Sequence, residues 1–229
     1  TFLDKNEKKQ YAWQNSWGFT TITIGIMIAV HGDDKGLIVP PRLAETQVVI
    51  IPILFDKTKE KVLKKANEIL KSLKDYKVNL DDREDYSPGW KFNEHELKGV
   101  PIRIELGPKD LENNQVVLVR RDNFKKENVK FKDLNKKVGE TLESIQKNLY
   151  EKAKKSLYNN INEAKSLNDA KKIINSGKIA KVNWCNGAKC EEMIKAKIEG
   201  AKSLNISLAE KAKGKCFNCG NEAVGTSYF

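Results

Sequence analysis

The sequence predicts an α/β fold in its middle part, with helices packed on a mixed sheet, followed by a small module that carries all of its cysteines. Two patterns predict this arrangement. Apolar runs typical of strands alternate with amphipathic stretches typical of helices between residues 46 and 142, and the four cysteines fall within the last 45 residues. The 229 residues are 39% apolar, enough for a folded core, and 42 basic against 31 acidic residues give a net charge of +11. This excess favours a polyanionic partner such as nucleic acid or an anionic membrane.

The first 45 residues have the pattern of the tail of a domain. An aromatic stretch at 11–19 leads into an apolar run at 20–30, which leaves little polar face and is therefore either a buried strand or a buried helix. A turn at 31–36 precedes a short strand at 37–42 that ends at prolines. No apolar run approaches the roughly 20 residues that span a bilayer, so we expect a soluble protein. Because the chain opens without an initiator methionine or a signal peptide, we also expect an intracellular fragment of a longer polypeptide.

The elements of the middle part follow from local signals. In chain order we expect a strand at 48–54, a helix at 57–73, a brief strand at 77–80, a helix from Pro88 to Gly99, and strands at 102–106 and 115–119. The first strand is continuously apolar and β-branched, which suits burial on both faces of a sheet. The first helix has apolar residues at helical spacing and lysines on its other face. The second helix opens at Ser87-Pro88, because proline suits the first turn of a helix.

A lysine-rich tract follows, with 15 lysines against 7 acidic residues from 123 to 181. Apolar residues at helical spacing predict one long amphipathic helix over 138–153 and a second helix over 167–174. A lysine-rich helix face is either simply solvated or in contact with a phosphate backbone, in which case affinity falls steeply with salt. Base recognition needs other side chains, and the α/β part is better placed to supply them.

The C-terminal module contains two pairs of cysteines separated by 25 residues, Cys185 with Cys190 and Cys216 with Cys219. Two close thiolates on each of two loops complete the tetrahedron that zinc prefers and leave no position for water, which makes a structural metal site. Two disulfides or four unrelated core cysteines are the alternatives, and a reducing compartment favours the metal. The two histidines, His31 and His95, belong to no ligand or catalytic motif, so we expect both on the surface or in turns.

The order of these motifs resembles a known family. The stretch WQNSWGFTTITIGIMIAVHGDDKGLIVPPRLAETQVVIIPI is similar to the end of the class II catalytic domain, and its junction to the anticodon-binding domain, in prolyl-tRNA synthetases of the archaeal and eukaryotic type. The similarity continues through DDREDYSPGWKFNEHELKGVPIRIELGPKDL and VVLVRRDN to WCNGAKCEE and CFNCG. It therefore covers nearly the whole chain.

The resemblance implies three domains. Residues 1–45 would be the C-terminal part of the class II catalytic domain with its motif 3, residues 46–142 the anticodon-binding domain, and residues 143–229 an α+β zinc-bearing C-terminal domain. Motif 3 would form a strand to about Phe19 and a buried helix from Thr21. In it Thr20 would contact ATP, and three residues would help to wall the proline pocket, Ser16, Trp17 and Gly18.

The resemblance also implies an enzyme, a proline--tRNA ligase that activates proline with ATP and Mg²⁺ and transfers it to tRNA(Pro). Such an enzyme would be cytoplasmic, without a membrane partner, and a homodimer through its catalytic domain. Arginine, lysine and glutamate suit the edges of the two guanines that proline anticodons share, and our candidates for these contacts are Arg83, Glu105, Lys109 and Arg120. The zinc ligands would be Cys185, Cys190, Cys216 and Cys219.

The chain departs from the family pattern in three places. The family motif is Thr-Thr-Arg-Thr-Ile-Gly, with an arginine that binds ATP, whereas this chain has Ile22, which offers neither charge nor a hydrogen bond. Motifs 1 and 2 would lie before Thr1, so we expect this chain alone to be inactive. The chain ends Tyr228-Phe229, whereas family members end in tyrosine. The alternatives are a non-catalytic synthetase-like module that binds tRNA or other RNA, and a zinc-stabilised protein that binds an acidic partner.

Overall fold

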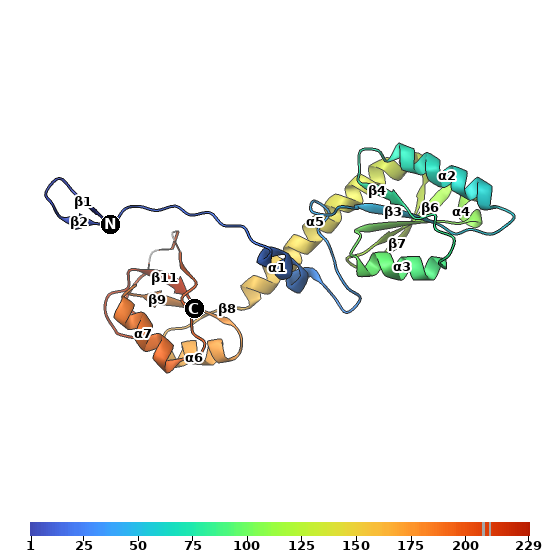
Figure 1. Cartoon of the computed structure of the whole chain (residues 1–229). Coiled ribbons are helices and arrows are strands. Elements are labelled where there is room, and N and C mark those ends of the chain that lie inside the picture. Colours follow the sequence, from blue (N-terminus) through green and yellow to red (C-terminus); the bar gives the residue numbers. More distant parts are fainter. Residues whose placement is uncertain (208, 211) are drawn as a thin grey trace. The chain divides into compact units, whose positions relative to one another are not determined.

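The computed structural model describes residues 1–207, 209, 210 and 212–229 of the chain (Figure 1). These residues form two compact units, Thr1–Leu149 and Tyr150–Phe229. Each unit has a hydrophobic core of its own. Among the described residues, no helix is long and apolar enough to cross a membrane.

The first unit begins with little regular structure. A short antiparallel hairpin joins β1 (Phe2–Leu3) to β2 (Lys9–Gln10), and the first helix, α1, spans Ile22–His31. The expected strand up to Phe19 is wrong, because residues 11–20 form no ladder of backbone hydrogen bonds with any other described residue. The expected helix is confirmed, but its expected burial is wrong, since no residue of α1 is buried. Four of its isoleucines have exposed fractions between 42% and 69%, Ile22, Ile24, Ile26 and Ile28.

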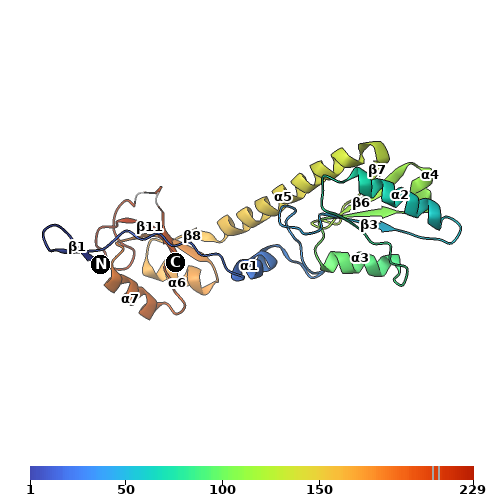
Figure 2. The same cartoon turned by 45° about the horizontal axis from the view of Figure 1, so that its top comes forward.

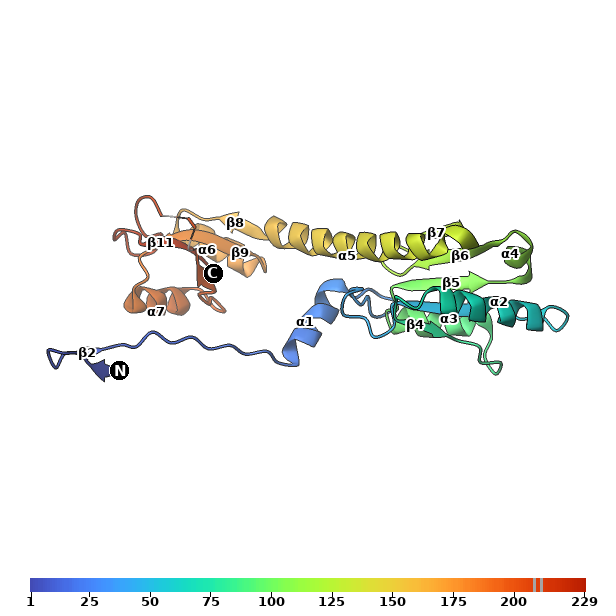
Figure 3. The same cartoon turned by 90° about the horizontal axis from the view of Figure 1, so that it is seen from above.

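The α/β part of the first unit is built on a five-stranded mixed sheet in the order β4-β3-β5-β6-β7. Its strands are β3 (Val48–Pro52), β4 (Val78–Leu80), β5 (Ile102–Leu106), β6 (Gln115–Arg120) and β7 (Lys126–Lys130). β3 is parallel to β4 and β5, whereas β5 and β6, and β6 and β7, are antiparallel. β4, β5, β6 and β7 can be followed across Figure 3. A mixed sheet with crossover helices is the predicted α/β fold.

Helices cover both faces of this sheet (Figure 1). α2 (Lys59–Ser72) and the first part of α5 (Leu134–Asn159) lie on one face, and α3 (Pro88–Leu97) lies on the other. Successive residues of a strand point to opposite faces. Ile104 of β5 therefore joins the core under α2 and α5, while its neighbours Arg103 and Glu105 face α3.

The start of α3 follows the expected signals. Pro88 occupies the first turn, and Ser87 caps the helix because its Oγ accepts the N–H of Trp90 at 3.3 Å. Between β5 and β6, where the sequence predicts no element, lies a short helix, α4 (Pro108–Glu112). The Asp110 carboxylate accepts the N–H of Gly107 at 2.9 Å and so stabilises the first turn of α4.

Two further segments differ from the expectations. Residues 37–42 form no strand, because the N–H groups of Leu37 and Val39 bond to the end of α3 and the following turn rather than to a strand. β7, which the sequence reasoning missed, has only one buried residue, so no apolar alternation marks it. A 3-10 turn, η1 (Phe131–Asp133), joins β7 to α5.

α5 is the long helix that the lysine-rich tract predicts, and its last turns belong to the second unit. That unit contains the strands β8 (Ile161–Glu163), β9 (Ile179–Trp184), β10 (Asn205–Ile206) and β11 (Gly225–Tyr228), and the helices α6 (Leu167–Asn175) and α7 (Ala188–Lys197). The strand order is β10-β11-β9-β8, with β8 parallel to β9 and the other pairs antiparallel. α6 and α7 lie beside this sheet (Figure 2).

The last residue of the chain belongs to the core of the second unit. Phe229 is 5% exposed, and its ring centre lies 5.3 Å from that of Trp184 and 5.6 Å from that of Phe217. Its backbone N–H and carbonyl both bond to Ala180, at 3.0 and 2.9 Å. Phe229 is therefore part of the packing of the second unit.

Candidate nucleic-acid interface and metal centre

The four cysteines come together in the second unit. Their sulfur atoms all lie within 4.8 Å of one another, with Cys185 Sγ 3.5 Å from that of Cys219 and Cys190 Sγ 3.8 Å from that of Cys216. A tetrahedral zinc ion with Zn–S bonds of about 2.3 Å holds its sulfur ligands about 3.8 Å apart, so the cluster has the size of such a site. All four side chains are free thiols, and these separations are far longer than the roughly 2 Å of a disulfide bond.

The loops around the cluster direct donors at sulfur. Burial opposes ionisation of Cys216, but the backbone N–H groups of Cys219 and Asn218 outweigh it and lower the pKa of this thiol to about 7. Burial raises the pKa of Cys190 to about 12, although Asn218 Nδ2 donates to its sulfur at 3.2 Å. Gly220 has φ +73°, in the left-handed region that glycine favours, and lets the chain turn directly after Cys219. The cluster could therefore bind a metal ion, with release of the thiol protons.

On the α3 side of the first sheet, an ion cluster surrounds Glu105. Arg103 donates from Nε and Nη2 to Glu105 Oε1 at 3.0 and 2.9 Å, and from Nη1 to Glu96 Oε1 at 2.5 Å. The guanidinium carbon also lies 4.3 Å from the ring centre of Phe92. Lys126 Nζ, on a side chain that is 58% exposed, lies 3.5 Å from both carboxylate oxygens of Glu105. Glu105 is thus fixed by a buried arginine and has an exposed amino group at its outer edge.

Sequence reasoning selected Glu105 but missed its partners Arg103, Glu96 and Phe92. A signal for them exists. The alternation Ile-Arg-Ile-Glu-Leu in β5 puts Arg103 on the same face as Glu105, and Phe92 and Glu96 are four residues apart on one side of α3. What the sequence does not give is the packing of that side of α3 against that face of β5.

A second ion cluster surrounds Asp81, just after β4. Arg83 donates to both carboxylate oxygens of Asp81, at 2.8 and 2.7 Å, and also pairs with Glu94. His95 Nε2 lies 2.9 Å from Asp81 Oδ2, and Lys91 Nζ donates to the Asp81 carbonyl oxygen at 3.1 Å. The hydrogen bonds from Arg83 hold the pKa of Asp81 well below its usual range, despite the opposing effect of burial.

This second cluster corrects one expectation and adds to another. His95, expected on the surface or in a turn, is 7% exposed, because its ring pairs with Asp81 between α3 and the sheet. Arg83, an anticodon candidate, is engaged by two carboxylates and braces the loop after β4. Asp81, Glu94 and His95 also have the spacing of metal ligands, but Arg83 and Lys91 supply the positive charge there.

The other two anticodon candidates lie elsewhere. Lys109 is exposed in the first turn of α4. Arg120, at the end of β6, donates to Asp122 at 2.9 and 2.8 Å and to Ser144 Oγ of α5 at 3.0 Å, so it lies on the opposite side of the sheet from Glu105. Among the described residues, no hydrogen bond or ion pair joins any two of the four candidates. The structure therefore brings them to the same domain but not into one cluster.

The residues that motif 3 would contribute to an active site lie on the exposed segment at the start of the first unit. The side chains of Trp17 and Ile22 are exposed, and Ser16, Gly18 and Thr20 are exposed as well. A Cβ added at Gly18 would meet nothing within 4 Å. Ligand pockets are concave and bury most of their ligand, so ATP or proline could bind here only with further protein surface around the segment.

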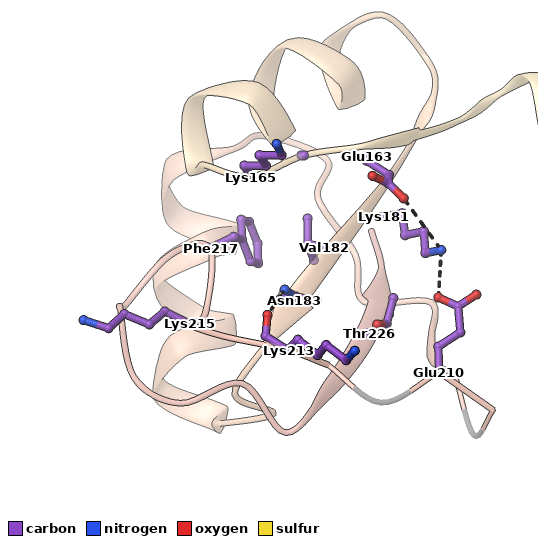
Figure 4. Close-up of a pocket in the computed structure, with 11 residues that line it drawn as sticks. Glu163, Lys165, Lys181, Val182, Asn183, Glu210, Lys213, Lys215, Phe217 and Thr226 are labelled. Carbon is purple, nitrogen blue, oxygen red and sulfur yellow. Dashed lines mark hydrogen bonds and ion pairs between the residues drawn. The ribbon is translucent and has the colours of Figure 1, made fainter.

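A cavity of about 360 Å³ lies in the second unit (Figure 4). On one side of it, Lys181 Nζ is 2.7 Å from a carboxylate oxygen of Glu210 and 4.0 Å from one of Glu163. Figure 4 also shows Lys215 extending away from the cavity. Lys181 is therefore engaged by carboxylates of the cavity wall.

Comparison with known proteins accounts for both the sheet and the cysteine module. Residues 47–141 match the family model described as "Anticodon binding domain", and residues 167–229 match the one described as "Prolyl-tRNA synthetase, C-terminal". A "Proline--tRNA ligase" of Natranaerobius thermophilus is 43% identical over 96% of this chain and 46% of its own length. Another, of Ruminiclostridium cellulolyticum, is 46% identical over 100% of this chain and 48% of its own. The chain belongs to the prolyl-tRNA synthetase family.

The chain spans about half the length of the two ligases just named. A "Bifunctional glutamate/proline--tRNA ligase" of Cricetulus griseus is also similar, 43% identical over 93% of this chain but only 16% of its own length. The chain corresponds to the C-terminal portion of the family. Its anticodon-binding match covers the five-stranded sheet, and its C-terminal match contains the cysteine cluster.

Proposed function

We propose that this chain is the C-terminal part of a proline--tRNA ligase, which joins proline to tRNA(Pro) with ATP and Mg²⁺. The observation that carries the proposal is the 43–46% identity, over nearly the whole chain, to proteins of that name. Within this activity the chain binds the anticodon and contributes motif 3, with Ser16, Trp17 and Gly18 at the proline pocket and Thr20 at ATP. The complete enzyme acts in the cytoplasm as a homodimer through its catalytic domain.

The surface that we propose for the anticodon is the α3 side of the sheet around Glu105. A carboxylate accepts hydrogen bonds from the N1–H and amino groups of an unpaired guanine. Arg103 offsets the charge of Glu105, which reduces its repulsion of RNA phosphates, and Lys126 adds an exposed cation. Of the other candidates, Arg83 then stabilises the loop after β4, and Lys109 and Arg120 supply positive charge around the domain.

Binding of the tRNA(Pro) anticodon stem-loop tests this surface. We expect the chain to bind the natural stem-loop more tightly than one with both guanines replaced by adenine. Because one base contact is worth roughly 1–3 kcal/mol, we expect Glu105→Gln to reduce this difference in affinity by about 5- to 150-fold. The matched control is Glu60→Gln, an exposed glutamate in α2 on the other face of the sheet. Equal affinity of the unsubstituted chain for both stem-loops at moderate salt would contradict the proposal.

We propose a structural zinc ion for the cysteine cluster, with Cys185, Cys190, Cys216 and Cys219 as ligands. The sulfur spacing and the backbone N–H groups directed at Cys216 support it. Four protein ligands leave no open position for a water molecule, so the ion stabilises the fold and takes no part in chemistry. Metal analysis of the purified protein is expected to find one zinc per chain, and less than one in Cys216→Ser. An equal content in both proteins would contradict the ligand set.

A non-catalytic RNA-binding module is the second candidate, and Ile22 favours it. Proline-dependent pyrophosphate exchange by the full-length protein, with and without Ile22→Arg, separates the two. Exchange by the unsubstituted protein supports the ligase. Exchange that appears only in Ile22→Arg supports the non-catalytic module. In that case the lack of one guanidinium at position 22 is what prevents the activation of proline. The control is Ile24→Arg, a second exposed position of α1 that should restore nothing.

A further inference from the structure

The segment after α1 is joined closely to the end of α3 within the first unit. The N–H groups of Leu37 and Val39 donate to the carbonyl oxygens of Leu97 and Gly99, at 3.0 and 3.2 Å. Gly36 has φ +120° and Gly99 has φ +74°, and a Cβ on either would lie 2.8 or 2.7 Å from backbone atoms of the opposite segment. Two glycines therefore permit an approach that no other residue would allow, and the two segments pack as one layer.

Arg121, which follows β6, holds the same junction. Its side chain is 1% exposed, and Nη1 and Nη2 donate to the two carboxylate oxygens of Asp33 at 2.8 and 2.6 Å. Its Nε donates to the carbonyl oxygen of Glu96 at 2.8 Å. Among the described residues, Asp33 is the only carboxylate that forms an ion pair with this guanidinium. A buried charge thus depends on a single partner, and that partner lies two residues after α1 ends.

Glu96 connects this junction to the proposed anticodon surface. Its carbonyl accepts from Arg121, while its carboxylate accepts from Arg103, which in turn holds Glu105. A continuous row of hydrogen bonds therefore leads from Glu105 to Asp33. Each member of this row is a charged side chain or the backbone of the last turn of α3. Charge-assisted hydrogen bonds are short and strong, so a displacement at one end is passed on to the other.

We propose that Arg121 is a positioning residue: through Asp33 it keeps α1 in a fixed relation to the anticodon surface, so that correct anticodon contact favours the motif 3 geometry used in tRNA charging. The inference rests on the proposed function. It adds a structural connection, inside this chain, between recognition of the anticodon and charging of the tRNA. A row of contacts is a coupling route only if breaking its middle uncouples the ends. The decisive experiment therefore breaks the Arg121–Asp33 pair without changing α1 or Glu105.

The test uses Asp33→Asn in the full-length protein, which removes the charge but keeps the shape of a side chain that is 36% exposed and so should fold. Asp34→Asn, at the neighbouring exposed residue, is the matched control. Three quantities are measured: proline-dependent pyrophosphate exchange without tRNA, the melting temperature, and kcat for charging natural tRNA(Pro) relative to tRNA(Pro) with altered anticodon guanines. The second variant is Arg121→Lys, which keeps the positive charge but loses the bidentate hydrogen bonding to Asp33.

We expect Asp33→Asn to reduce the kcat ratio between natural and altered tRNA about fivefold or more, in the usual range of coupling between sites. Exchange without tRNA should stay within about twofold and melting should fall by only a few degrees, with Asp34→Asn unchanged in all three. An unaltered kcat ratio would overturn the inference, as would a parallel loss of exchange and melting stability, which marks a merely structural pair. Failure of the unsubstituted protein to charge tRNA(Pro) would instead overturn the proposed function, and the inference with it.

Discussion

At the scale of single residues, the first unit is organised by charges that are buried in pairs. Arg103, Arg121 and Asp81 are each less than a tenth exposed, and each meets opposite charge in well-aligned hydrogen bonds. Removing one member of such a pair leaves the other buried without compensation, which costs about 3–5 kcal/mol, whereas exposed pairs contribute less than about 1 kcal/mol. Burial, more than the number of ion pairs, decides which charges matter to stability.

One prediction compares a buried pair with an exposed one. Arg103→Ala leaves Glu105 and Glu96 near the sheet without their shared cation, so we expect a loss of about 3–5 kcal/mol in the free energy of unfolding. Arg42→Ala breaks an ion pair with Glu143 in which both side chains are about 70% exposed, so we expect a loss below about 1 kcal/mol. Urea unfolding followed by circular dichroism measures both. Similar losses in the two variants would mean that Arg103 is not the shared counter-charge.

The ion pair of Asp33 also predicts a dependence of stability on pH. Hydrogen bonds from Arg121 lower the pKa of this carboxyl from 3.8 to about 2. A lowered pKa in the folded state contributes stability above pH 4, and that contribution is lost as the pH falls to 2. We expect Asp33→Asn to unfold with a weaker pH dependence in this window, by about 1 kcal/mol after allowance for solvent screening. Chemical denaturation at pH 2, 3, 4 and 6 measures the difference, and identical pH profiles would rule out the pair.

At the scale of elements, two apolar segments, β3 and α1, differ in how far the rest of the unit buries them. β3 is buried at all five positions, whereas α1 has no buried residue although most of its residues are apolar too. The stability of an apolar segment comes from what packs against it, and helix propensity adds little to this.

This contrast predicts opposite effects of core-type substitutions. Ile24→Ser in α1 removes a side chain that is 54% exposed, and we expect a change below about 0.5 kcal/mol in the free energy of unfolding. Ile104→Ala in β5 opens a cavity at a fully buried position, with an expected loss of about 2–5 kcal/mol. Thermal unfolding of the two variants measures both. A large loss in Ile24→Ser would show that α1 packs within this unit.

The contrast also explains how far the sequence predicts the structure. Patterns that depend on neighbours in the chain are confirmed: the buried strand β3, the start of α3 at Pro88, and the long amphipathic helix. Features that depend on distant partners are not. A strand at residues 11–19 needs a neighbouring strand, β7 has almost no buried side to reveal it, and the burial of His95 depends on Asp81 across the helix–sheet interface. The four cysteines are gathered as their spacing predicts, whereas the metal they bind and the residues that read the anticodon stay predictions.

At the scale of the whole molecule, the two units have separate cores, and only the second contains the cysteine cluster. Cys190 and Cys216 belong to that core together with Phe217 and Phe229, and the other two cysteines pack against it, so the core of this small unit is built around the proposed metal. Binding energy of order 10 kcal/mol at such a site is also folding energy. The first unit, whose core contains no cysteine, has no such requirement.

Removal of metal is therefore expected to act on one unit alone. A strong chelator should unfold residues 150–229 and leave the melting of the first unit unchanged, and added zinc should restore the lost transition. Calorimetry of the treated chain, with hydrogen exchange to assign each transition, measures this. Matched treatment with the chelator already saturated with zinc is the control. Two unaltered transitions in metal-free protein would exclude a structural metal.

The buried position of Phe229 has a practical consequence. Its ring packs against that of Trp184, which is 4% exposed, whereas the side chains of Trp13 and Trp17 are exposed. A quencher dissolved in the solvent can therefore reach Trp184 only as fast as this part of the second unit opens. The tryptophan fluorescence that resists quenching thus reports local opening of the second unit, and it can be measured without any label on the protein.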